Sequence, residues 1–92
     1  MTVDEKNIKF HKYDQTPTQL YTARIYLHVN IGAENIGNLL SYRCFISTKL
    51  GVRLRKCVIH TARRMDFQIF VLHLDENDNS DDIAIKAKLL YG

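Results

Sequence analysis

The most evident chemical feature of the sequence is an acidic run at residues 75–82, which reads DENDNSDD. Its carboxylate and amide oxygens are the ligands that Ca²⁺ prefers, and an EF-hand loop places such ligands at alternate positions. Counted from Asp75, however, the sixth position holds Ser80 where the sharp turn requires glycine. The twelfth position holds Lys86, a cation, where a bidentate glutamate is required. We therefore predict a solvated turn after a strand, with no metal and no cofactor.

Cysteine and histidine side chains form a second set of metal-binding type, at Cys44, Cys57, His60 and His73. Structural zinc requires four ligands that converge on one point. Cys57 and His60 are three residues apart on an expected strand, so their side chains point to opposite faces. Cys44 lies on the apolar side of an expected helix, where a free cysteine behaves as a small hydrophobic residue. This set is not expected to bind zinc.

Nucleophilic catalysis has one candidate, Cys57, because Arg53 and Arg55 are expected to share its strand face and cationic neighbours favour a thiolate. A nucleophile also needs a base that a third group holds in place, and the sequence indicates no such trio. It also contains no glycine-rich phosphate loop and no Gly-x-Ser-x-Gly motif. We predict that the protein is not an enzyme.

Charge is distributed in blocks along the chain. Residues 43–64 carry seven Lys or Arg side chains and no acid, whereas residues 65–92 carry six acids and two lysines. Such an arrangement produces a directional field, which bears on partners and not on fold. We expect the four arginines of this basic block that follow the helix to form the main functional surface: Arg53, Arg55, Arg63 and Arg64.

Residues 20–31 are expected to position further binding side chains. They alternate apolar and polar residues, which is the period of a half-buried strand. The polar face presents a mixed basic and aromatic stripe, and single-stranded nucleic acid requires both positive charge for phosphates and rings on which bases stack. We therefore predict a single-stranded RNA- or DNA-binding regulatory or accessory protein. The predicted binding residues are Arg24, Tyr26, His28, Lys49, Arg53, Arg55, Lys56, Arg63 and Arg64.

A protein-interaction or inhibitory module, including a homodimer, is the alternative function. Tyrosine and arginine are enriched in interface hot spots, and an exposed edge strand at 7–13 or 83–91 offers backbone pairing. An acidic protein surface is then the partner. Arginines exposed to water favour nucleic acid, whereas arginines paired with the acidic run at 75–82 favour the alternative.

The remaining elements follow from hydrophobic periodicity. We expect strands at 7–13, 20–31, 52–60 and 67–74, and the last of these is nearly continuously apolar, which suits a strand buried on both faces. We expect a helix at 33–50, whose apolar stripe consists of Ile36, Leu39, Leu40 and Cys44, widened by Phe45 and Ile46. Residues 42–47 also suit a strand, but the helix is preferred. At 83–91 a strand and a helix compete, and the alternation favours the strand. The fold class is α+β: a two-layer domain with a mainly antiparallel sheet of four to five strands and one helix on one face.

Composition limits the class of protein. Residues 1–92 are long enough for a single domain with its own core. The longest apolar run, at 69–72, is far shorter than a membrane span, so no membrane partner is expected. Two cysteines without a glycosylation sequon indicate a reducing compartment. We expect an intracellular protein, cytoplasmic or nuclear.

Overall fold

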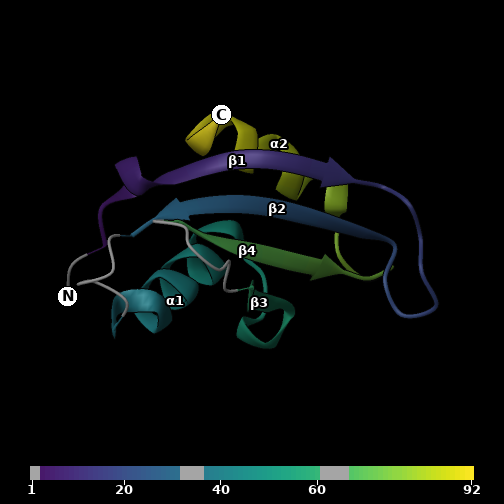
Figure 1. Cartoon of the computed structure of the whole chain (residues 1–92). Coiled ribbons are helices and arrows are strands. Elements are labelled where there is room, and N and C mark those ends of the chain that lie inside the picture. Colours follow the sequence, from purple (N-terminus) through teal and green to yellow (C-terminus); the bar gives the residue numbers. More distant parts are fainter. Residues whose placement is uncertain (1–2, 32–36, 61–66) are drawn as a thin grey trace.

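Four strands and two helices form two layers in the structure, a computed structural model that describes residues 3–31, 37–60 and 67–92. The sheet is antiparallel in the order β1-β2-β4-β3, and both helices lie on the same side of it (Figure 1). The strands are β1 (Ile8–Asp14), β2 (Ala23–Asn30), β3 (Cys57–His60) and β4 (Phe67–Leu74). The helices are α1 (Leu39–Leu50) and α2 (Ser80–Tyr91), with single 3₁₀ turns η1 (Glu5–Asn7) and η3 (Leu54–Lys56). The predicted α+β class is confirmed.

The central strands of the sheet are β2 and β4, and β2 carries the alternation that the sequence predicts. The two strands pair along their whole length, with Ile25 opposite Leu72 and Leu27 opposite Phe70. These four side chains are fully buried and face the helices. Burying each one stabilises the fold by about 1.5–3 kcal/mol. The predicted strands at 20–31 and 67–74 are therefore confirmed, and one face of each is core.

Strand β1 contains an irregularity that changes its alternation. Its register on β2 shifts between Phe10 and Lys12, which leaves His11 as an extra residue. As a consequence Phe10 and Tyr13, three residues apart, both pack against the core. His11 and Lys12 are adjacent in the chain, yet both line a hollow on the opposite face of the sheet. The bulge thus places two consecutive polar side chains on one surface.

Helix α1 confirms the preference for a helix at 42–47, and its buried face matches the predicted stripe in part: Ile46 is buried, and Leu39 and Phe45 pack against the core. Tyr42, Ile46 and Leu50 follow the i, i+4, i+8 spacing and are buried. Leu40 is 64% exposed and Cys44 is also exposed, so the predicted apolar stripe was wrong at these positions. The i, i+4 series that includes Tyr42 presents more continuous bulk to the sheet.

The two ends of α1 differ in how well the sequence located them. Residues 33–36 of the predicted helix lie outside the described residues, and the regular helix begins at Leu39. At the other end Gly51 adopts a left-handed φ of 70°, and its N–H donates to the carbonyls of the last turn. This is the predicted C-terminal cap, since glycine takes this conformation without a Cβ penalty.

The expectation of a strand at 83–91 was wrong, because residues 80–91 form α2. Ala84, Ala87 and Tyr91 are buried against the sheet and α1, and the small alanines allow close approach. Aspartates occupy the first turn and a lysine the last, which suits the helix macrodipole. The apparent alternation came from Ile85 and Leu89, which are instead 55% and 82% exposed.

The predicted strand at 52–60 was wrong in its first half. Only Cys57–His60 form β3, and the preceding residues make the η3 turn. The guanidinium group of Arg43 holds this turn, donating from Nε to the carbonyl of Cys57 at 2.6 Å and from Nη2 to that of Leu54 at 2.9 Å. Arg53 and Arg55 therefore do not project from one face of a strand.

In the described parts of the chain, no helix is long and apolar enough to cross a membrane.

A buried hydroxyl ties the N-terminal segment to α1 and provides a test of this packing. Tyr42 Oη accepts hydrogen bonds from the backbone N–H of Asp4 at 3.0 Å and from Asn7 Nδ2 at 2.9 Å. We predict that Tyr42→Phe lowers the free energy of unfolding by about 1–2 kcal/mol in urea titrations, because both donors lose their acceptor. Tyr13→Phe is the control, since the Tyr13 hydroxyl bonds Asp81 on the exposed surface. Equal losses in both variants would contradict the prediction.

Candidate functional site

The face of the sheet opposite the helices carries all four histidines of the sequence. They come from four different strands: His11 from the bulge of β1, His28 from β2, His60 from β3 and His73 from β4. In the register, His28 and His60 both pair with Ile69, which places them on either side of one position of β4. We call this surface the open face, because no described helix lies over it (Figure 1).

An open hollow of about 470 Å³ occupies this surface, within the range of about 300–1,000 Å³ that is usual for small-ligand sites. Two aliphatic side chains of β4, Ile69 and Val71, contribute its apolar part. The other lining side chains are polar or aromatic: His11, Lys12, Tyr26, His60 and His73. Tyr26 and Val71 are register partners, so the tyrosine ring stands beside the apolar part.

The histidines of the open face make an aromatic contact, and two of them have shifted pKa values. His11 and His28 are stacked, with ring centroids 4.1 Å apart. Burial, and then the charge of His11, lowers the pKa of His28. Burial also lowers the pKa of His73, whose Nδ1 is buried and has no hydrogen-bond partner among the described residues. Burial thus favours the neutral form of both rings.

Positive charge on the open face at neutral pH comes mainly from β1. Lys12 Nζ lies 5.8 Å from the centroid of the Tyr26 ring, a cation–π geometry, and Lys9 is exposed on the same strand, opposite His28. These lysines and three of the histidines were missed as site residues. The sequence did contain a signal for the position of His73, since Ile69, Val71 and His73 alternate with the core residues of β4. The reading of residues 67–74 as buried on both faces concealed it.

Of the predicted stripe on β2, Arg24 is already engaged by the protein itself. Its Nη2 donates to Asp14 Oδ2 at 3.0 Å and to the carbonyl of Thr16 at 3.2 Å. The backbone N–H of Thr16, and then Arg24, lower the pKa of Asp14 to about 2. The structure thus brings Arg24, Tyr26 and His28 onto one face as predicted, but the charge of Arg24 is compensated.

Lys56 forms ion pairs with two aspartates of the acidic run. Its ammonium group is 2.6 Å from Asp78 Oδ2 and 2.9 Å from Asp75 Oδ2, and the residue is only 7% exposed. Hydrogen bonds to Asp78 and then to Asp75 raise the pKa of Lys56, and Lys56 lowers the pKa of Asp75. The predicted turn is confirmed at 75–79, whereas the rest of the run begins α2. The described residues contain no group of three or more acidic, histidine or cysteine side chains that could hold a metal.

The other predicted basic residues are not gathered on one surface. Arg53 and Arg55 are exposed, make no ion pair with another described residue, and border a hollow of about 350 Å³ beside the acidic turn. Lys49 lies on α1, in the helix layer, with Nζ 4.0 Å from Glu5 Oε1. Arg63 and Arg64 lie outside the described residues. Of the predicted basic residues, Arg53 and Arg55 are thus exposed to water, whereas Lys56 is paired with the acidic turn.

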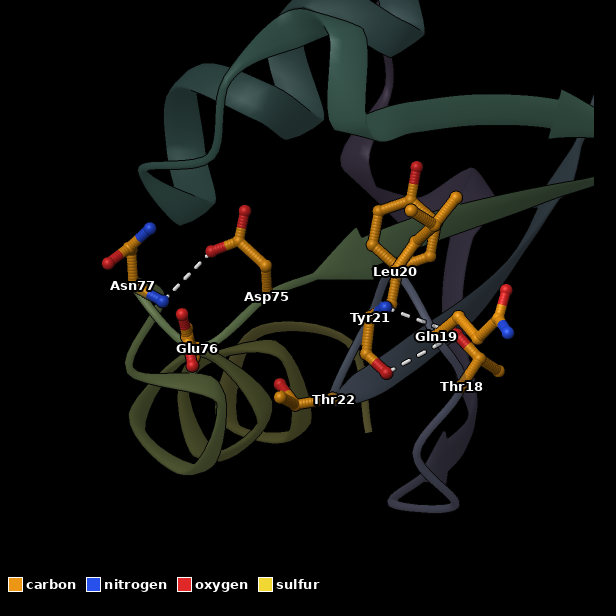
Figure 2. A pocket seen from close by; sticks show the side chains of 8 residues that line it. All are labelled: Thr18, Gln19, Leu20, Tyr21, Thr22, Asp75, Glu76 and Asn77. Atoms are coloured by element: carbon orange, nitrogen blue, oxygen red, sulfur yellow. Dashed lines mark hydrogen bonds between the residues drawn. The ribbon is translucent and has the colours of Figure 1, made fainter.

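The acidic turn has a second neighbour across a polar hollow of about 380 Å³. Figure 2 shows the turn on one side of this hollow and the segment that leads into β2 on the other. Each side has a hydrogen bond within its own segment: the N–H of Asn77 donates to Asp75 Oδ1, and that of Tyr21 to Thr18 Oγ1. These bonds hold the two loops that line the hollow.

Of the two cysteines, one lies where the sequence predicts and the other does not. Cys57 is fully buried on the helix side of β3 and His60 lies on the open face, as predicted. Burial raises the pKa of Cys57 to about 11, so its thiol is protonated and enclosed. Cys44 is exposed rather than packed on an apolar stripe, and both thiols are free.

The Lys56 contacts predict a large effect of a single substitution. We predict that Lys56→Met lowers the free energy of unfolding by about 2 kcal/mol in urea titrations, because two carboxylates lose their buried cation. Arg55→Met is the matched control: the residue is an exposed neighbour, so its loss should stay within about 0.5 kcal/mol. If the Lys56 variant is as stable as the control, the ammonium group does not stabilise the turn.

The histidine environment predicts how stability depends on pH. Since His28 and His73 have pKa values below the ordinary 6.5, the unfolded chain binds more protons in mildly acidic solution. Their contribution is complete above pH 6.5 and is lost as pH falls through the folded-state pKa values. We predict a lower free energy of unfolding at pH 5.5 than at pH 7.5, and a smaller difference in a His28→Gln/His73→Gln double variant. Equal wild-type stability at both pH values would refute this.

Comparison with models of protein families, with curated proteins and with solved structures gave no match to this chain. The function must therefore be inferred from the geometry itself. That geometry is an open sheet face on which Tyr26 and three histidines line a hollow with an apolar part, His28 stacks on one of them, and two lysines lie along one edge strand.

Proposed function

We propose that this protein binds single-stranded RNA or DNA across the open face of its sheet, without catalysing a reaction. The observation that carries the proposal is the joint presence of exposed rings, an apolar hollow and β1 lysines on one surface. Charge alone is common on protein surfaces, and an apolar hollow alone suits many ligands. Nucleic acid requires both, because its phosphates are anionic and its bases are flat and poorly hydrated.

Single strands fit this surface better than a duplex. In a duplex the faces of the bases are stacked on one another, so only phosphates and base edges reach a flat protein surface. An unstacked base can instead lie against Tyr26 or a histidine ring, and base–aromatic stacking is worth about 1–3 kcal/mol. Lys9 and Lys12 then supply charge for the backbone of the strand.

The footprint we propose extends toward the arginines predicted from sequence. Arg24 and His73 are register partners at the end of the sheet where β2 begins and β4 ends. At this same end η3 leads into β3, whose first residue pairs with Leu72. A strand that leaves the open face here passes close to Arg53 and Arg55. Both free thiols are compatible with the intracellular location that we propose for this activity.

Fluorescence-anisotropy titrations with single-stranded RNA, single-stranded DNA and duplex DNA test the proposal. We predict that both single strands bind more tightly than the duplex, with a slope of about −0.7 per phosphate contact in log K against log salt. The Lys9→Glu/Lys12→Glu variant should bind at least tenfold more weakly than wild type, because each reversal replaces attraction to phosphate with repulsion. Lys49→Glu/Lys86→Glu makes the same charge change away from the open face and should bind within about threefold of wild type.

An Arg53→Glu/Arg55→Glu variant separates the two surfaces. A moderate loss of affinity agrees with arginines at the end of the footprint. If this variant alone abolishes binding and the β1 variant binds normally, the open face is not the binding surface. No binding of any strand at low salt, by a folded protein, would refute the proposed function.

A protein partner remains the second candidate because of α2. Ile85, Leu89 and Leu90 are exposed on this helix by 55%, 82% and 41%, and Ile85 and Leu89 share one face at i, i+4 spacing. Such residues are unusual on a surface that contacts only water. Sedimentation analysis of wild type and Leu89→Glu distinguishes the cases: a dimer that the substitution dissociates favours this candidate.

A further inference from the structure

We propose that the hollow of the open face is a subsite for one unstacked nucleobase, with the phosphate of the same nucleotide held by Lys12. This inference rests on the proposed function and adds a specific ligand position to it. The subsite is built by three strands that are distant in the sequence: β4 supplies its apolar part, β2 a tyrosine ring, and β1 the cation.

The shape and chemistry of the hollow suit a flat heterocycle. Ile69 and Val71 are i, i+2 neighbours on β4, so their side chains stand on the same face and form one apolar surface. Tyr26 pairs with Val71 across β2 and β4, which places its ring next to that surface. A base resting on the aliphatic side chains would contact the aromatic ring and leave water, the two contributions that single-strand sites combine.

The histidines give the hollow polar groups for the edge of a base. A neutral imidazole has one donor and one acceptor nitrogen, which matches the mixed donors and acceptors of nucleobases. His73 lines the hollow, and burial lowers the pKa of its ring, which favours the neutral imidazole. His60 is on β3, on the other side of β4 from Tyr26, and it is an exposed residue that also lines the hollow.

Lys12 identifies the ligand as a nucleotide and not merely a flat ring. The residue lines the hollow, and its ammonium group stands 5.8 Å from the centroid of the Tyr26 ring. A base stacked near Tyr26 would therefore bring its own phosphate within reach of a cation. The volume of about 470 Å³ accommodates such a unit, whereas a base within a duplex cannot enter.

The experiment compares two strands of equal charge. One is a labelled ten-residue DNA single strand of mixed sequence, and the other has the same length and phosphates but lacks every base. We expect the abasic strand to bind wild-type protein at least tenfold more weakly in anisotropy titrations, because it gains only the phosphate contacts. Equal binding of the two strands would overturn the base subsite while leaving phosphate-driven binding intact. If neither strand binds, the proposed function fails together with the subsite.

Two variants locate the effect. Tyr26→Leu keeps an apolar side chain but removes the ring, so it should weaken the natural strand about tenfold and leave the abasic strand unchanged. Lys9→Gln, at an exposed β1 residue that does not line the hollow, should weaken both strands by the same factor. Backbone-amide NMR spectra of each variant verify that it is folded. Equal weakening of both strands by Tyr26→Leu, in a folded protein, would overturn the assignment of the base to this hollow.

Discussion

The pairing of β2 with β4 constrains every other feature of the molecule. Their apolar side chains meet in register, Ile25 against Leu72 and Leu27 against Phe70, and all four are excluded from water. A slip of one residue would turn this set toward solvent and bring His28 and Tyr26 into the core, at a cost of several kcal/mol. Burial of the apolar face therefore determines which side chains lie on the open face. Its histidines and tyrosine stand in defined positions because the core leaves them no alternative.

The two helices complete this arrangement by covering the same side. α1 contributes Tyr42, Ile46 and Leu50 to the core, and α2 contributes its alanines and Tyr91. Because both lie on one side, the other side of a four-stranded sheet remains free of described helices (Figure 1). The β1 bulge adds to this surface, since it turns His11 and Lys12 outward together while Phe10 and Tyr13 still reach the core. Binding surface and core are two consequences of the same strand register.

Charge in this protein is organised by contacts and not by position in the chain. The basic block of residues 43–64 appears in the sequence as one feature, yet its members serve different purposes. Arg43 supports the η3 turn through backbone carbonyls, and Lys56 is buried between Asp75 and Asp78. Arg53 and Arg55 remain exposed. The acidic run that resembled a calcium loop receives its positive charge from a lysine of the same chain.

The sequence by itself determined the strands of the central pair, the glycine that ends α1, the turn at 75–79 and the α+β class, because these depend on local periodicity and local backbone preferences. It also placed Arg24, Tyr26 and His28 on one face, since alternation is a local property. It did not determine the helix at 80–91, where apolar residues satisfy two periods at once, nor the bulge that joins His11 to His28. Only the tertiary structure decided which face the helices cover, which cation meets the acidic turn and which four histidines share a surface. Those outcomes depend on contacts between residues that are far apart in the chain, and no local pattern encodes them.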